Sequence, residues 1–279
     1  MSELREDYYV PHSSPYPVLL AAGLFLLVLG FILQMNAQAP GRWFMLAGAG
    51  VVVFVLFGWF GAVVAENQGR KFHDWEDRSF RWGMVWFIAS EVMFFAAFFG
   101  ALYYLRNISV PELGETELLW PGYQGSWPTS GPAGKAFTPM AAWGIPALNT
   151  MILLSSGATV TWAHWGLLKN RRGQLIGGLA MTVALGCLFL GFQAHEYADA
   201  YQQLGLTLGA GVYGATFFML TGFHGLHVTI GAIGLTAVLG RAIKGHFTPQ
   251  DHFGFEGVAW YWHFVDVVWL MLFVFVYWL

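Results

Sequence analysis

The chain has 279 residues, of which 57% are hydrophobic and only 10% are charged. Soluble domains carry about 25% charged residues, so this composition excludes an ordinary soluble protein. The formal net charge of −3 argues against nucleic-acid partners, which select strongly basic surfaces. The single cysteine, Cys187, excludes an internal disulfide bond and a cysteine-rich metal site.

Long apolar stretches separated by short polar connections dominate the chain. A helix that crosses a bilayer needs roughly 20 mainly apolar residues. The stretches predict an all-α, polytopic membrane protein with seven transmembrane helices in a single transmembrane domain, residues 1–279. The predicted spans are 17–33, 43–65, 81–105, 141–168, 174–197, 212–239 and 257–279. The connection between the third and fourth spans, Arg106 to Met140, is rich in proline and is predicted to be irregular.

The basic residues predict the orientation of these spans. If the N-terminus lies inside, the inner segments hold every lysine and arginine except Arg42, Arg106 and Lys135. Segments that remain in the cytoplasm carry an excess of lysine and arginine. We therefore expect a cytoplasmic (or matrix) N-terminus and an external C-terminus.

The third span carries an acid, Glu91, ten residues beyond Arg81. At about 1.5 Å per residue this places the carboxyl group about 15 Å from the inner surface. An acid at such depth usually faces the bundle interior and is functional. Two interpretations stay open: a neutral acid hydrogen-bonded within the bundle, or a role in proton, lipid or partner contact.

Further polar residues are expected at a similar depth in the last two spans. His224 and His227 lie near the middle of the sixth span, and their spacing predicts one shared face. Glu256, His263 and Asp266 fall within one broad stripe of the seventh span. An unpaired polar group is costly in lipid, so we expect Glu91 to pair with His224 or His227.

Several chemistries could use such a layer of polar groups. Two histidines on one helix at this spacing do not point to opposite faces of one haem, so haem ligation is weakly indicated. A metal site would need three or four convergent ligands, and a proton relay would need a chain of acids and histidines. The remaining alternative is a layer of mutual hydrogen bonds that fixes the helix register.

Five segments of the sequence resemble a known family. They are 81–95 (RWGMVWFIASEVMFF), 146–164 (PALNTMILLSSGATVTWAH), 192–200 (FQAHEYADA), 211–231 (GVYGATFFMLTGFHGLHVTIG) and 252–270 (HFGFEGVAWYWHFVDVVWL). Together they resemble the signature segments of subunit III of cytochrome c oxidase, and the resemblance extends over essentially the whole chain.

The resemblance implies a non-catalytic membrane subunit of a proton-pumping oxidase that reduces oxygen to water. It implies two helix groups, the first two spans and the remaining five, around a V-shaped cleft that holds phospholipids. The expected partners are subunit I by direct packing, subunit II, other oxidase subunits and membrane lipids. The haems and copper are expected in partner subunits, with no cofactor in this chain. The expected location is a bacterial inner membrane, with the mitochondrial inner membrane as the alternative.

The resemblance also assigns roles to individual residues. Glu91 matches the family's buried acid, and the lipid-binding positions are Glu66, His73, Arg241, Lys244 and His246. No catalytic residue and no metal ligand is assigned. The sequence departs from the family at two places around the end of the second span. Trp59, Phe60 and Gly61 stand where many members have two tryptophans followed by a small residue and an aspartate, and Ala65 stands where many have an arginine.

Two other functions remain as alternatives. One is the corresponding subunit of a quinol oxidase, whose members tend to be shorter with fewer spans. The other is a haem- or metal-binding membrane protein that uses His224, His227, His263 and Asp266.

Overall fold

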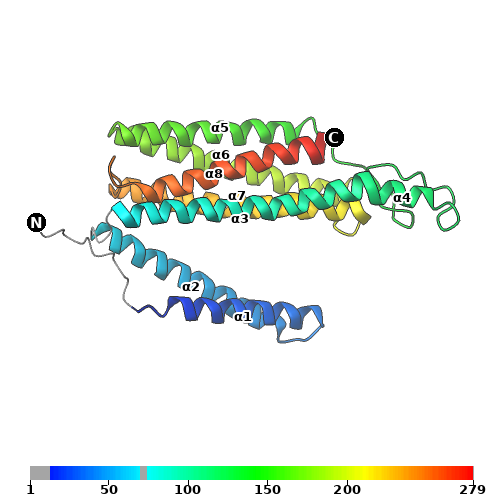
Figure 1. The fold of residues 1–279 in the computed structure, drawn as a ribbon, viewed down its shortest axis with the longest axis horizontal. Coiled ribbons are helices and arrows are strands. Elements are labelled where there is room, and N and C mark those ends of the chain that lie inside the picture. Colours follow the sequence, from blue (N-terminus) through cyan, green and yellow to red (C-terminus); the bar gives the residue numbers. More distant parts are fainter. Residues whose placement is uncertain (1–12, 70–73, 279) are drawn as a thin grey trace, which may run out of the picture. The chain divides into compact units, whose positions relative to one another are not determined.

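The computed structural model describes residues 13–69 and 74–278, and all regular structure within them is helical (Figure 1). The chain divides into two compact units, Met1–Phe80 and Arg81–Leu279, and each is described by itself.

The first unit contains a helical hairpin of α1, Tyr16–Met35, and α2, Gly41–Gln68. Glycines let the two backbones approach closely, as small residues do between membrane helices. A Cβ atom on Gly48 would lie 2.6 Å from the backbone nitrogen of Leu27, and one on Gly41 would lie 2.6 Å from that of Gln34. The hairpin therefore depends on glycine at these positions.

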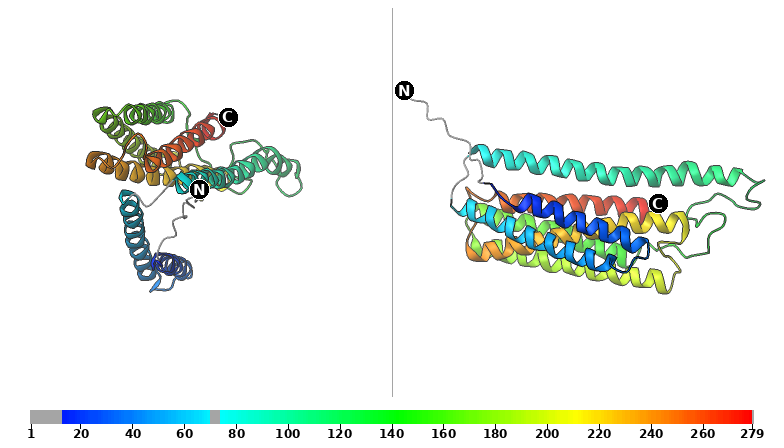
Figure 2. Two further views of the ribbon diagram at one scale, coloured as in Figure 1. Left: turned by 60° about the vertical axis from the view of Figure 1, so that its left-hand side comes forward. Right: turned by 90° about the horizontal axis from the view of Figure 1, so that it is seen from below.

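The second unit is built around α5, Ile145–Leu168; α6, Arg172–Gln202; α7, Gly211–Lys244; and α8, Phe253–Leu272. These helices lie side by side in all views (Figures 1 and 2). A π-helical turn, η2, Phe273–Trp278, continues α8. The largest fully buried side chains of the core include Trp262 and Trp269 of α8. Half of the most apolar window of Phe253–Trp278 is buried, so α8 is the central packing element of this unit.

Polar side chains of α5 bind the buried tryptophans of α8. The indole nitrogen of Trp262 donates to Oγ of Ser156 at 2.8 Å, and that of Trp269 donates to Oγ1 of Thr150 at 2.9 Å. A buried indole N–H usually needs such a partner. These two bonds fix the register of α5 against α8.

The helix α3, Asp74–Tyr104, begins before the boundary between the units and runs through the second. It continues through η1, Leu105–Ser109, a π-helical turn, into α4, Val110–Glu115. The predicted irregular connection from Arg106 is therefore wrong in its first part, because helix extends to Glu115. The helical run Trp75–Glu115 has 41 residues and is about 60 Å long, twice the apolar core of a bilayer.

Within the described residues, six helical runs have the length and composition to cross a membrane. They are Tyr16–Met35, Gly41–Gln68, Trp75–Glu115, Arg172–Gln202, Gly211–Lys244 and Phe253–Trp278. The helix α5 has 24 residues but is not among them. Its asparagine, serine and threonine residues lower its hydropathy, although several of them are satisfied inside the bundle.

Candidate functional site

The buried acid of α3 is paired with a histidine of α7. Oε2 of Glu91 lies 2.8 Å from Nε2 of His227. The expected pairing of Glu91 with His224 or His227 is therefore confirmed, with His227 as the partner. Both side chains are largely buried, with exposed fractions of 22% for Glu91 and 11% for His227.

The other ring nitrogen of His227 limits the protonation states of this pair. Nδ1–H donates to the carbonyl oxygen of Phe223 at 2.6 Å. In a neutral ring Nε2 is then an acceptor, so the hydrogen must come from a protonated Glu91. If Glu91 is ionised instead, the ring must be a doubly protonated imidazolium. Either way, the hydrogen bond between Glu91 and His227 contains one proton, which can lie on either residue.

Aromatic rings surround this pair. The rings of Phe95 and Tyr261 lie 5.0 and 6.3 Å from the imidazole of His227, measured between centroids. Phe94 packs edge-on against Phe223 at 5.1 Å, one helical turn before His227. These contacts join α3 to α7 and α8 through long side chains and shield the pair from water.

His224 lies in a different environment from His227. It is fully buried between Phe189 at 5.8 Å and Trp269 at 5.1 Å, and neither ring nitrogen has a hydrogen-bond partner within the described residues. The two histidines of the predicted shared face therefore contact different neighbours. Residues three apart differ by about 60° around a helix, and the crowded bundle directs the two rings to different neighbours.

His263 and Asp266 form a third, separate contact at α5. Nδ1 of His263 lies 3.6 Å from Oδ2 of Asp266, and Nε2 lies 3.3 Å from Oγ1 of Thr161. Gly157 of α5 has no side chain, and a Cβ atom there would collide with the Asp266 carboxylate. The midplane polar residues therefore form separate contacts, and no shared ligand set of His224, His227, His263 and Asp266 exists in the described structure.

The expected lipid-binding residues on α7 lie around the C-terminal end of that helix. Gly245 has a φ of 76°, and the amide of His246 donates to the carbonyl of Arg241 at 3.1 Å. This is a left-handed glycine cap, which ends the helix at Lys244. The guanidinium of Arg241 lies 4.5 Å from the ring centre of Phe247, and Lys244 is exposed. The cap thus gathers Arg241, Lys244 and His246 at one helix end.

The remaining two expected lipid-binding residues lie in or just after α2. Glu66 is in the last turn of α2 and is partly buried. His73 lies outside the described residues.

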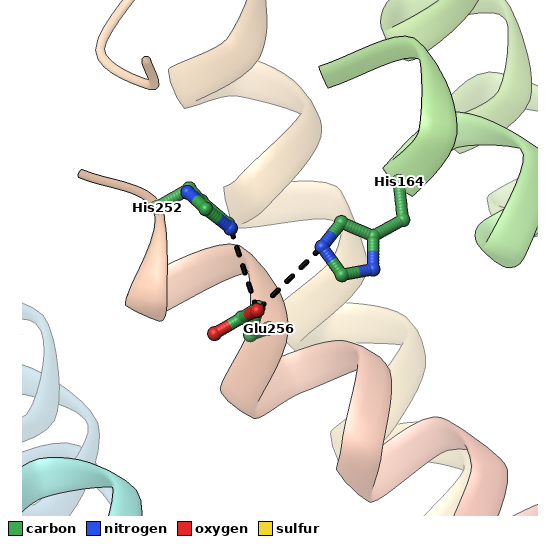
Figure 3. A group of neighbouring side chains, drawn as sticks. All are labelled: His164, His252 and Glu256. Carbon is green, nitrogen blue, oxygen red and sulfur yellow. Dashed lines mark ion pairs between the residues drawn. The ribbon is translucent and has the colours of Figure 1, made fainter. Parts of the chain in front are cut away.

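Sequence reasoning missed a cluster at the ends of α5 and α8, shown in Figure 3. It contains His164, His252 and Glu256, whose ligand-capable atoms all lie within 4.8 Å of one another. Arg81 of α3 is ion-paired with the second carboxylate oxygen of Glu256. The spacing of His252 and Glu256, four residues apart at a helix start, is the only local signal for this cluster.

A second missed contact joins α6 to the C-terminal turn. The Tyr277 hydroxyl donates to Oε1 of Glu196 at 2.6 Å, and both side chains are buried. Glu196 belongs to the segment 192–200, which the sequence singled out only by its resemblance to a family.

Long apolar helices, buried tryptophans and polar contacts between helices define a polytopic helical membrane protein. The comparisons with known proteins identify the family. The family model described as cytochrome c oxidase subunit III matches residues 6–279.

Named relatives agree with this match over nearly the whole chain. Cytochrome c oxidase subunit 3 of Marchantia polymorpha is 40% identical over 275 residues, covering 98% of this chain and 97% of that protein. The subunit 3 proteins of Formosania lacustris and Pongo abelii are each 40% identical over 279 residues, covering 100% of this chain and 99% of each relative. The chain belongs to the cytochrome c oxidase subunit III family, and it is a subunit of an oxidoreductase complex.

Proposed function

We propose that this chain is a non-catalytic subunit that carries no redox centre, packs against subunit I and holds phospholipids. The observation that carries the proposal is the apolar surface of α1, α2 and α3. Only 11% of the most apolar window of each is buried inside the chain. Phe57 and Trp86, for example, are 76% and 71% exposed. Apolar surface of this extent needs a cover, and lipid chains and partner helices supply it.

The proposed topology has seven spans, with α5 as the span that hydropathy alone does not select. Its polar side chains bind neighbouring helices, as in Trp269 to Thr150, so they add little cost in lipid. The distribution of lysine and arginine supports a cytoplasmic (or matrix) N-terminus and an external C-terminus. The proposed location is a bacterial inner membrane, with the mitochondrial inner membrane as the alternative. The grouping of spans 1–2 and 3–7 around a V-shaped lipid cleft belongs to the proposal and rests on the family resemblance.

The proposed headgroup site is the cationic end of α7. Arg241 and Lys244 lie in its last turn, and His246 follows the glycine cap. Guanidinium and ammonium groups at a membrane surface attract lipid phosphates. Glu66 and His73 are proposed to line a second lipid contact after α2.

The proposed contribution to proton uptake lies in the Glu91–His227 pair. Its hydrogen bond contains a proton that can lie on either residue, and aromatic rings surround it. The proposal includes partner subunits I and II, which would carry the haems and copper.

Isolation of the tagged chain in mild detergent tests the proposal. An optical spectrum of the complex that copurifies with the chain should show haem. After the complex is dissociated, the haem should stay with the partner proteins. The separated chain should be colourless, and mass spectrometry should find phospholipid on it. Haem or copper retained by the separated chain would contradict the proposal, as would recovery of the chain without haem-bearing partners.

A double variant tests the headgroup site. Arg241→Gln with Lys244→Gln should lower the phospholipid that copurifies with the chain, because both cations are removed. Lys135→Gln, in the segment before α5, removes a cation elsewhere and is the control. Equal lipid content in both variants and the unmodified chain would contradict this assignment.

A further inference from the structure

The cluster of His164, His252 and Glu256 lies where the C-terminal end of α5 meets the start of α8 (Figure 3). His164 lies four residues before the end of α5, and His252 immediately precedes α8. Oε1 of Glu256 lies 3.4 Å from Nε2 of His252 and 3.6 Å from Nε2 of His164. Both histidine rings thus direct Nε2 to one carboxylate oxygen.

The nitrogens of this cluster have unused bonding capacity. Neither ring nitrogen of His252 has a hydrogen-bond partner within the described residues, and neither does Nε2 of His164. His252 is only 7% exposed. Buried polar atoms are normally paired, and an unpaired one calls for an explanation such as a bound ion. An ion placed between Nε2 of His164, Nε2 of His252 and Oε1 of Glu256 would use all three atoms.

The spacing of these atoms fits a tetrahedral metal. Zinc binds histidine nitrogen and carboxylate oxygen at about 2.0–2.2 Å, so two ligand atoms at the tetrahedral angle lie about 3.4 Å apart. The two distances from Glu256 are 3.4 and 3.6 Å. The third, between the histidine nitrogens, is at most 4.8 Å, and a small rotation of the half-buried His164 ring would shorten it.

We propose that His164, His252 and Glu256 form a binding site for a divalent cation of the zinc type, joining the end of α5 to the start of α8. Two imidazoles and one carboxylate are a donor set typical of zinc with an open fourth position for water. Magnesium prefers oxygen ligands and is disfavoured at this site. The site holds no redox chemistry, and it is independent of the proposed lipid and subunit contacts.

Arg81 influences the affinity of this site for a cation in two ways. Its guanidinium is paired with Oε2 of Glu256 and lies 5.6 Å from the ring centre of Phe253. The contact orients the carboxylate so that Oε1 faces the histidines. It also places a positive charge beside the cation, so Arg81 positions the ligand and at the same time weakens binding.

Titration of the full chain in detergent with Zn²⁺ alone tests the proposal. We expect saturable binding at one site per chain and a rise in the unfolding temperature with Zn²⁺ concentration, because a ligand that binds only the folded state stabilises it. Co²⁺ as an optical probe should give the intense visible bands of a tetrahedral site. Mg²⁺ should produce neither effect.

Single substitutions locate the site. His164→Gln, His252→Gln and Glu256→Gln should each weaken Zn²⁺ binding by more than about tenfold, since even groups outside the ligand set change affinity by 10–100-fold. Arg81→Gln should strengthen binding, because a competing charge is lost. His195→Gln is the matched control: His195 is 63% exposed and its Nδ1 lies 3.1 Å from Asp199, so it offers a histidine–acid pair without a third ligand.

Unfolding of each variant without metal shows whether the variant is folded, and His164→Gln, at a half-buried position near a helix end, is the least disruptive of the three. Absence of Zn²⁺ binding to the unmodified chain would overturn the proposal. So would binding that His164→Gln leaves unchanged, or binding that His195→Gln weakens equally, because the ion would then be adventitious.

Discussion

At the scale of single residues, the buried polar groups are satisfied pair by pair. Glu91 binds His227, Glu196 binds Tyr277, and Trp262 binds Ser156. Each bond joins two helices, and lipid offers no water to replace a lost partner. Not every buried polar group has a partner in the described structure: both ring nitrogens of His224, which packs between aromatic rings, and both of His252 lack a hydrogen bond.

Substitution of Glu91 separates the roles of its charge and its hydrogen bond. Glu91→Ala leaves Nε2 of His227 buried without a partner, at a cost of about 1–3 kcal/mol of unfolding free energy. Glu91→Gln should retain nearly full stability, because its amide N–H can donate to Nε2 while Nδ1–H still donates to Phe223. The measurement is thermal unfolding of the chain in detergent, followed by near-ultraviolet circular dichroism.

Equal destabilisation by both substitutions would contradict the neutral form of this pair. It would indicate that a carboxylate and an imidazolium are required, since glutamine has no charge to offer.

The sequence predicted a contact of Glu91 with His224 or His227, because shared depth and the cost of an unpaired acid restrict the possible partners. It did not predict that His224 and His263 point to other neighbours, since rotation of each helix about its axis depends on packing. In the cluster of Figure 3, His164 lies 88 positions before His252 and 92 before Glu256, and spacing carries no signal for a contact at that separation.

At the scale of helices, the long apolar stretches of the sequence located each long helix but not its ends. The helix α7 was expected to end near Leu239 and instead reaches Lys244, where Gly245 provides the left-handed cap. The third helix was expected to end at Leu105 and instead continues through η1 to Glu115. Hydropathy follows the apolar core of a bilayer, whereas helix ends are set by caps beyond it.

The α1–α2 hairpin offers a paired test of glycine packing. A Cβ atom on Gly48 would lie 2.6 Å from the Leu27 backbone, whereas a Cβ atom on Gly50 would have no neighbouring atom within 4 Å. Gly48→Leu should therefore separate α1 from α2 and lower resistance to proteolysis in that unit. Gly50→Leu should leave it unchanged. Proteolysis of both variants in detergent, followed by mass spectrometry, compares them.

If the Gly48→Leu variant resisted proteolysis as well as the Gly50→Leu variant, the close backbone approach of Gly48 to Leu27 would not be needed to stabilise the hairpin.

At the scale of the whole molecule, the apolar surface is unevenly covered. The most apolar windows of α6, α7 and α8 are 33%, 39% and 50% buried, against 11% for each of α1, α2 and α3. Hydropathy does not predict this contrast, because all these helices are apolar enough to cross a membrane. Only the packing in the structure distinguishes a helix buried in the core from one whose apolar surface is left for lipid or a partner protein to cover.

Removal of this chain from the oxidase tests its role in the complex. The haem spectrum should remain largely intact, because the redox centres are proposed to lie in partner subunits, while activity should decay during turnover. The measurement is an optical spectrum and a time course of oxygen consumption for complexes with and without the chain. Loss of the haem signals on removal would contradict a non-catalytic role.

The position of α8 at the centre of its bundle has a consequence for biosynthesis. Ser156 and Thr150 of α5 enter the membrane before the ribosome has made their partners Trp262 and Trp269. Until then, the hydroxyls of Ser156 and Thr150 bond only the backbone of α5, and Glu196 lacks the hydroxyl of Tyr277. We therefore expect the bundle to pack fully only after α8 has been made and inserted.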